Sequence, residues 1–462
     1  MTFLRLQFSI TLFLFLLFLT SHGDAQENKS TGGQTLSIIT PHTESIRQEI
    51  GLKFSNWYQE RFKENIKLDW RNVGGSSDTI RFIRSEFTAK PNGIGLDILF
   101  GCGVDPYFDL KNEKLLEHCL LSEDILAPIP ADNQGTLLRD PDGFWYGVTI
   151  ATFGILNNLR VQEYNHLLQP KSWKDLALPE LHDWVAISDP RNSGSMYTMM
   201  EVILQGYGWE EGWRILTGMA ANSTSIGRYA TDAPRLTALG NTASGICIDF
   251  YGFTQVNAHG KTNMIFTIPE DFSILSPDCI AILKGTEHLQ EAQRFIEFVL
   301  SDDGQKLWMF PVGTSEGPVR SALLRMPIRK DLYSRYPQYS PVQNSPFHES
   351  NTVNGNTNSI FTLDNDLAYK RRDLVCGLIG AQLIDTHPEL RKAWTEAIRR
   401  GKAEETLTRL SKPLITENEL QTLLQNEWKD PIQKNRIKIR WQVEAQSRCR
   451  AIRKELCQQP KI

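Results

Sequence analysis

A polar turn between a predicted strand and a predicted helix is the first feature of the sequence that could bind a ligand. The apolar run 185–188 indicates a buried strand, the turn 189–195 follows it, and a helical pattern begins at about Met196. The first backbone N–H groups of a helix have no partner within the helix, and the helix dipole attracts negative charge there. This junction is therefore suited to hold an anion by hydrogen bonds, without any covalent step.

The turn contains residue types that fit this use. Ser193 and Ser195 offer hydroxyl groups, Gly194 lets a ligand approach the backbone, and Arg191 adds a fixed positive charge. The simpler alternative is that one of the two serines only caps the helix, because serine is a common capping residue. The sequence leaves both interpretations open.

A second junction of the same kind occurs earlier in the chain. A strand predicted at 66–70 leads into a Gly-Gly-Ser-Ser-Asp loop and then into a helix from Thr79, which makes Gly75, Ser76 and Ser77 candidate ligand contacts. Neither junction has the spacing of a nucleotide-binding loop. Two anion sites in separate parts of one chain predict a ligand that is held from two sides.

The elements around these loops alternate between strand and helix. Strands are predicted at 36–40, 66–70 and 95–100, with helices at 45–62 and 79–87. This alternation favours a parallel α/β sheet, in which ligands bind beyond the carboxyl ends of the strands. His42, Thr43, Ser76 and Cys102 would meet at that edge. A histidine after a strand can equally be an ordinary hydrogen-bonded loop residue.

A second alternation predicts a second lobe. Its strands are expected at 148–156, 185–188 and 245–251, and the last of these places Asp249 and Tyr251 at its end. Tyr251 could contact the ligand or serve only as an aromatic wall. With Val148 and Ile268 as the crossings between lobes, we expect one lobe from 36–147 plus 269–340 and another from 148–268.

The remaining segments lie outside the two lobes. Helical spacing of apolar residues predicts a helical extension over 359–462, which we expect to pack on the first lobe. Residues 1–25 have the pattern of a secretory signal peptide cleaved near Ala25, with an uncleaved anchor as the alternative. The net charge of −4 does not favour nucleic acid as a partner. The seven cysteines form no zinc-binding pattern, and their pairing cannot be read from the sequence.

Together these segments resemble the periplasmic solute-binding proteins of ABC importers, in the class that includes ferric-iron-binding and sugar-phosphate-binding proteins. The resemblance covers residues 36 to about 318 and is carried by the segments 37–44, 74–78, 189–195, 248–251 and 301–305. It implies a two-lobed periplasmic-binding-protein type II fold with two crossing strands. It also implies a periplasmic monomer without a cofactor, which binds a solute without chemistry and delivers it to an ABC permease in the inner membrane.

The resemblance also bears on the ligand. Ferric-iron-binding relatives use two adjacent tyrosines near 250–251, but here the first is Phe250. The glutamate that such relatives carry after the third strand is also missing, since Gly101-Cys102-Gly103 stands there. Ferric iron prefers hard oxygen donors. We therefore expect a small anionic or phosphorylated solute. Ferric iron with a bound anion, held by His42, Asp249 and Tyr251, remains the alternative.

Two other classes of function are compatible with such a fold. An enzyme could use Cys102 as a nucleophile, but no base is recognisable near it in the sequence, and a cysteine nucleophile needs one or a lowered pKa. A sensing module could present the loaded protein to a membrane sensor kinase. The sequence does not separate sensing from import.

Overall fold

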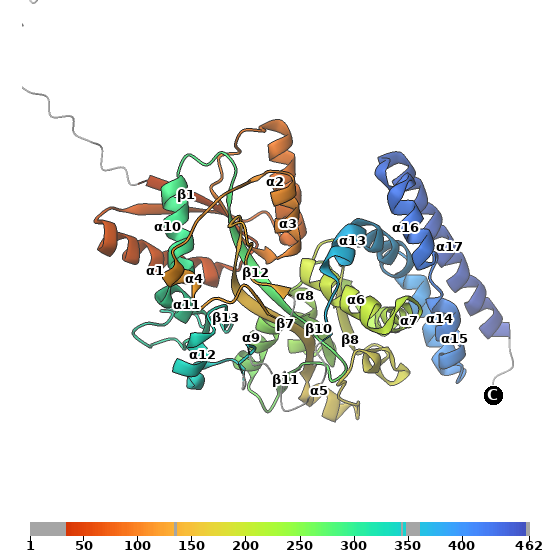
Figure 1. The fold of residues 1–462 in the computed structure, drawn as a ribbon. Coiled ribbons are helices and arrows are strands. Elements are labelled where there is room, and N and C mark those ends of the chain that lie inside the picture. Colours follow the sequence, from red (N-terminus) through yellow and green to blue (C-terminus); the bar gives the residue numbers. More distant parts are fainter. Residues whose placement is uncertain (1–33, 134–135, 343–344, 348–360, 459–462) are drawn as a thin grey trace, which may run out of the picture.

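The computed structural model describes residues 34–133, 136–342, 345–347 and 361–458 (Figure 1). The predicted signal peptide lies outside these residues. Among the helices that are described, none combines the length and the apolar character needed to cross a membrane.

One continuous sheet runs through the molecule in the order β2-β1-β3-β12-β7-β10-β8-β9. Its first part contains the parallel strands β1 (Gln34–Ile39), β2 (Ile66–Arg71) and β3 (Ile98–Gly103). The helices of this part are α1 (Glu44–Phe62), α2 (Ser76–Ala89), α3 (Asp105–Asn112), α10 (Leu289–Leu300) and α11 (Asp302–Met309). Apolar side chains of the strands and helices form two buried clusters, which make up the core of the first lobe.

Strand β7 (Tyr146–Asn158) connects the two lobes, and all of its residues are buried, as expected for a strand covered on both faces. Residues 146–152 pair with β12 (Leu275–Leu283), and residues 153–157 pair with β10 (Ser244–Ile248). The chain thus passes from one lobe to the other within β7 and returns at the start of β12. The first lobe consists of residues 34–152 and 275–347, and the second of residues 153–274.

The return crossing lies later than Ile268, where the sequence placed it. Residues 269–274 still contact the second lobe: the Glu270 N–H donates to the Lys171 carbonyl oxygen at 2.8 Å, and the Asp271 carboxylate accepts from the Trp173 N–H at 3.1 Å. The apolar run 264–268 had suggested an earlier crossing because β11 (Met264–Thr267) is an apolar strand, but it pairs with β7 inside the second lobe.

The second lobe also contains β8 (Val185–Ser188), β9 (Ser223–Gly227) and the helices α6 (Gly194–Tyr207), α7 (Trp209–Ala221), α8 (Asp232–Ala238) and α9 (Asp249–His259). The strand predicted over 245–251 ends at Ile248, because Asp249 begins α9. The short elements are β4 (Leu116–Glu117), α4 (Glu123–Leu126), β5 (Asp132–Asn133), β6 (Thr136–Leu137), α5 (Leu159–Tyr164), β13 (Met326–Pro327) and α12 (Asp331–Arg335).

The C-terminal extension is helical, as the apolar spacing predicts. It consists of α13 (Asn365–Ile379), a π-helical turn (Gly380–Ile384), α14 (His387–Arg399), α15 (Ala403–Ser411), α16 (Glu417–Gln425) and α17 (Pro431–Gln458). Asp364 caps α13 by accepting the Leu367 N–H at 2.9 Å, and Thr416 with Glu419 forms a capping box on α16.

The extension packs on the second lobe, and the expectation that it packs on the first is wrong. Figure 1 shows its helices beside α6 and α7, and a single buried apolar cluster joins residues of the second lobe to residues of the extension. Trp209 and Trp394 mark this interface, since the Trp209 indole N–H donates to the Ile415 carbonyl oxygen at 3.0 Å and the Trp394 indole N–H to Asn222 at 2.8 Å. Helical periodicity shows that a face is buried, but not against which partner.

Candidate ligand-binding cleft

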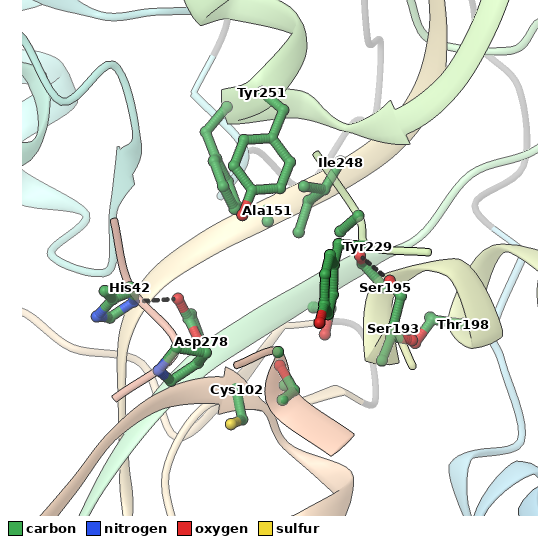
Figure 2. A pocket seen from close by; sticks show the side chains of 18 of the residues that line it. His42, Cys102, Ala151, Ser193, Ser195, Thr198, Tyr229, Ile248, Tyr251 and Asp278 are labelled. Atoms are coloured by element: carbon green, nitrogen blue, oxygen red, sulfur yellow. Dashed lines mark hydrogen bonds and ion pairs between the residues drawn. The ribbon is translucent and has the colours of Figure 1, made fainter. Parts of the chain in front are cut away.

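A cavity of about 270 Å³ lies between the two lobes. Figure 2 shows His42 and Asp278 on one side of it and Ser193 and Ser195 on the other. Its lining comes from both lobes and from the extension, and includes Pro41, His42, Asn72, Gly75, Ser76, Cys102, Asp105, Ser193, Gly194, Ser195, Tyr229, Ile248, Phe250, Tyr251, Asp278, Arg325 and Arg372.

The start of α6 forms one wall of the cavity. The Ser193 hydroxyl accepts the Met196 N–H at 3.2 Å and lies 3.2 Å from the Ser195 hydroxyl, and both serines and Gly194 line the cavity. Ser193 therefore caps the helix and also faces the cavity. The unpaired N–H groups and the positive end of the helix dipole lie at this wall.

The start of α2 faces α6 from the other lobe. Gly75 and Ser76 line the cavity, and a Cβ atom added at Gly75 would lie only 2.8 Å from the Asn192 carbonyl oxygen of the second lobe. A glycine is therefore needed for the two lobes to approach this closely. Ser77 points out of the cavity into a neighbouring groove, where its hydroxyl accepts from Arg372 at 3.3 Å.

A buried charged group forms the opposite wall. His42 Nε2 lies 2.9 Å from Asp278 Oδ2, and the Arg325 guanidinium pairs with the same carboxylate and lies 3.7 Å from the centre of the Phe250 ring. His42 Nδ1 and Arg325 Nε are buried without a hydrogen-bond partner among the described residues. Both side chains thus keep a polar atom without a partner.

The protonation states of this group follow from burial and pairing. Burial lowers the pKa of His42, and this effect is larger than the increase caused by Asp278. The imidazole is therefore neutral at pH 7. Burial alone would raise the pKa of Asp278, but His42 and Arg325 together bring it below its ordinary value. Asp278 is thus ionised, and its charge is matched by Arg325.

Cys102 lines the cavity with an unusual backbone. Its φ is 77°, a left-handed conformation that non-glycine residues rarely adopt. The thiol is buried, and this burial raises its pKa to about 12. A nucleophilic cysteine needs a lowered pKa, so the arrangement does not support the enzyme alternative. The preceding Gly101 leaves room for His42, since a Cβ atom there would lie 3.0 Å from the imidazole ring.

Asp249 and Tyr251 occupy the first turn of α9 but have different surroundings. Tyr251 lines the cavity, and burial raises the pKa of its hydroxyl. Asp249 is buried behind the lining, and its carboxylate accepts the Thr152 N–H at 3.0 Å and the Phe250 N–H at 2.6 Å. Burial raises the pKa of Asp249 to about 7, although both N–H groups lower it. Asp249 thus joins α9 to β7 at the point where the chain crosses between lobes.

The structure places Arg191 and Thr43 away from the cavity. Arg191 is hydrogen-bonded to Asp189 and bridges to Asp385 of the extension with distances of 2.9 and 3.0 Å. Gly380 leaves room for this contact, because an added Cβ atom would lie 2.8 Å from the guanidinium. The Thr43 hydroxyl is at the surface, 2.9 Å from that of Ser45. The geometry therefore does not support the predicted use of Arg191 against a bound anion.

Other residues of the lining were not predicted from the sequence. Arg325, Asp278 and Arg372 supply its charges, and Tyr229 and Asn72 contribute further polar atoms. Arg325 and Asp278 lie in segments without a recognisable motif, so no local pattern marked them. The pair Arg371-Arg372 was visible as part of an amphipathic helix, but the sequence did not show that one of the two reaches the cleft.

No group of three or more His, Cys, Asp or Glu residues within the described ranges is placed to hold a metal ion. The iron ligands suggested by the sequence, His42, Asp249 and Tyr251, do not meet in the cavity, because Asp249 is not part of its lining. Arg325 adds a positive charge at the wall of the cavity that His42 and Asp278 form.

Comparisons with known proteins place this cleft in context. Residues 97–316 match the family of bacterial extracellular solute-binding proteins. The chain is 30% identical over 207 residues to the phosphoglycerate transport regulatory protein PgtC of Salmonella typhimurium, which covers 45% of this chain and 50% of PgtC. The chain thus spans about half the length of the curated relatives it matches first.

Solved structures with the same fold cover more of the chain. The periplasmic binding protein AfuA from Actinobacillus pleuropneumoniae, with fructose-6-phosphate bound, aligns with a TM-score of 0.61 at 19% identity and covers 76% of this chain and 99% of AfuA. Iron-bound HitA from Pseudomonas aeruginosa aligns with a TM-score of 0.52 at 19% identity, over 74% of this chain and 98% of HitA.

The matched family and these neighbours are binding proteins and not enzymes, which agrees with the expectation from the sequence. The resemblance to solute-binding proteins and the predicted fold class are both confirmed. Residues 97–316 thus match bacterial extracellular solute-binding proteins, and the chain has the two-lobed fold of the type II periplasmic binding proteins.

Proposed function

We propose that this protein is the solute-binding component of an ABC-type importer. It captures a small phosphorylated or similarly anionic solute between its lobes in the periplasm and delivers it, as a monomer, to a permease in the inner membrane. The observation that carries this proposal is the meeting of two helix starts, those of α2 and α6, with Arg325 and Arg372 in one cavity. Helix N-termini and guanidinium groups are the preferred protein partners of phosphate.

The size and the walls of the cavity favour a small organic anion. Its volume of about 270 Å³ is just below the range of about 300–1,000 Å³ that is usual for ligand pockets. Tyr229, Phe250 and Tyr251 provide aromatic surfaces for the carbon part of such a ligand, while the serines and the helix starts face its charged group. A short-chain phosphate ester meets both requirements.

The comparisons support the same ligand class. PgtC is named for phosphoglycerate, and AfuA was solved with fructose-6-phosphate. Both compounds carry a phosphate ester on a small hydroxylated carbon skeleton. We propose this class of compound, and neither individual compound, as the ligand of the present chain.

Ferric iron is the weaker candidate as cargo, although the fold is shared with iron-bound HitA. Both oxygens of Asp249 are occupied by backbone N–H groups, and His42 is hydrogen-bonded to Asp278. The nearby Arg325 guanidinium would repel a cation. Of the three ligands that the sequence suggested, the Tyr251 hydroxyl and the Nδ1 atom of His42 stay without a hydrogen-bond partner among the described residues.

Sensing is a second candidate function, and one observation favours it. The relative PgtC is named a transport regulatory protein, so a loaded binding protein of this kind could report the solute to a membrane sensor. Both functions need the same ligand cleft. They differ in the membrane partner, which pull-down of solute-loaded protein with detergent-solubilised permease or sensor kinase would identify.

A ligand screen tests the proposal. We expect fructose 6-phosphate or phosphoglycerate to raise the melting temperature, since a ligand that binds only the folded state stabilises it. The double variant Ser76→Ala/Ser195→Ala should lose this shift, while Thr43→Ala, which changes a surface hydroxyl, should keep it. If no phosphate ester shifts the melting temperature and ferric citrate gives a coloured protein whose colour Tyr251→Phe abolishes, the protein carries iron and the proposal is wrong.

A further inference from the structure

We propose that Arg372 of the C-terminal extension is a ligand-binding residue of the cleft, and that it gives the cleft its preference for a doubly charged phosphate group. This inference rests on the proposed function. It assigns to the extension a part in solute recognition, in addition to its packing on the second lobe.

Arg372 lines both the cavity and the neighbouring groove, beside the two helix starts. Its Nη2 atom donates to the Ser77 hydroxyl at the start of α2 with a distance of 3.3 Å. The same atom lies 3.6 Å from the position that a Cβ atom would take at Gly194, at the start of α6. The guanidinium is therefore placed where the two anion-binding helix ends meet, although it comes from a third part of the chain.

The backbone that carries Arg372 is held firmly. The neighbouring Arg371 points the other way and forms a buried ion pair with Glu201 of α6, with exposed side-chain fractions of 1% and 0% and a closest distance of 2.7 Å. The Arg372 guanidinium lies 5.1 Å from the centre of the Tyr197 ring, and Tyr197 is itself hydrogen-bonded to Glu201 and to the Ala368 carbonyl oxygen. The position of Arg372 thus follows from the packing of α13 on α6.

The charge of Arg372 is not matched by a directly bonded carboxylate. Arg191, Arg325 and Arg371 each form an ion pair, whereas Arg372 forms none with any residue that the structure describes. Asp105 is the other carboxyl group that lines this part of the cavity. Burial raises the pKa of this carboxyl, although Arg372 lowers it.

This unmatched charge distinguishes a doubly charged ligand from a singly charged one. Arg325 and Asp278 together contribute no net charge, and the two helix ends contribute only partial charges. A phosphate ester carries close to two negative charges at neutral pH, whereas a sulfate ester of the same compound carries one. Arg372 therefore provides the full positive charge that the second negative charge of the phosphate requires.

Calorimetric titration of the full-length protein tests the assignment at one fixed pH. The probes are fructose 6-phosphate and phosphoglycerate, each compared with the corresponding sulfate ester. Arg372→Gln should weaken phosphate binding by about tenfold to a hundredfold and sulfate binding much less, because a charge-assisted hydrogen bond is lost. Arg372→Lys should keep most of the preference for phosphate. Lys370→Gln, on an exposed part of the same helix, is the matched control and should bind like the parent protein.

The outcomes separate this inference from the proposed function. If the parent protein binds no phosphate ester, the proposed function fails. If the parent binds one and Arg372→Gln binds it equally well, the assignment of Arg372 is wrong. If Arg372→Gln weakens phosphate and sulfate to the same extent while its circular dichroism melt matches the parent, Arg372 only holds the lobes together through Ser77, and the charge preference has another source.

Discussion

Replacement of Arg371 by methionine should strongly destabilise the protein. Arg371 contacts both oxygens of Glu201, at 3.0 Å through Nε and 2.7 Å through Nη2, and its Nη1 contacts Glu417 at 2.8 Å. In the Arg371→Met variant the Glu201 carboxylate would stay buried with only the Tyr197 hydroxyl and the Gln205 amide as donors. Removal of one partner from a buried ion pair lowers the free energy of unfolding by about 3–5 kcal/mol.

Urea unfolding followed by tryptophan fluorescence measures this loss, because Trp209 lies beside Arg371. The double variant Arg371→Met/Glu201→Met should recover most of the stability, since it leaves no unpaired charge in the interior. Lys370→Met is the control, because its ion pair with Asp366 is exposed and should contribute little to the free energy of unfolding. A loss in Arg371→Met no larger than in the control, or a double variant as unstable as the single one, would refute the reasoning.

Four further outcomes are expected. In the folded protein, iodoacetamide should label the exposed Cys457 quickly and Cys102 slowly, because Cys102 is buried and its pKa is raised to about 12. Mass spectrometry measures the two rates, and rapid labelling of Cys102 would instead support the enzyme alternative. Gly75→Ala should weaken binding of fructose 6-phosphate by about tenfold in calorimetry with little change in unfolding free energy, since the new methyl group keeps the lobes apart; unchanged affinity would contradict this. Burial raises the pKa of Asp249 from 3.8 to about 7, so the folded state keeps a proton that the unfolded chain releases, and this residue lowers stability as pH rises through that range. Asp249→Asn should therefore gain stability relative to the parent between about pH 4 and about pH 7 in urea unfolding, and parallel pH profiles would speak against it. Deletion of residues 364–462 should leave an insoluble or unstable protein, because it exposes the apolar faces of α6 and α7; a truncated form that melts at the parent's temperature would disprove this.

The parts of the site that the sequence predicted well are those with a local signal. Strands that end in glycine and serine loops and continue into helices are visible at 66–79 and 185–196, and the structure places Ser76, Ser193 and Ser195 in one cavity. Such junctions can be recognised because backbone conformation and capping depend on neighbouring residues.

The parts that could not be predicted depend on distant contacts. Asp249 looked like a strand residue at the cleft, but it begins α9 and binds the Thr152 N–H, which lies 97 residues away in sequence. Arg191 looked like a ligand residue because it lies in the anion-binding turn, yet its partner Asp385 is 194 residues away. An arginine in a turn is equally consistent with both roles, and only the folded chain decides between them.

The single apolar core shared by the second lobe and the extension has a consequence for the order in which the protein folds. The contacts that complete this core join Glu201 to Arg371 and Trp209 to Ile415, over separations of 170 and 206 residues. Domains generally fold as units during synthesis, beginning with those nearest the N-terminus. The second lobe cannot do so here, because one side of α6 and α7 stays uncovered until the extension has been synthesised. A chain that is interrupted before α13 therefore exposes a large apolar surface and also lacks Arg372, so incomplete protein is prone to aggregation and has an incomplete cleft.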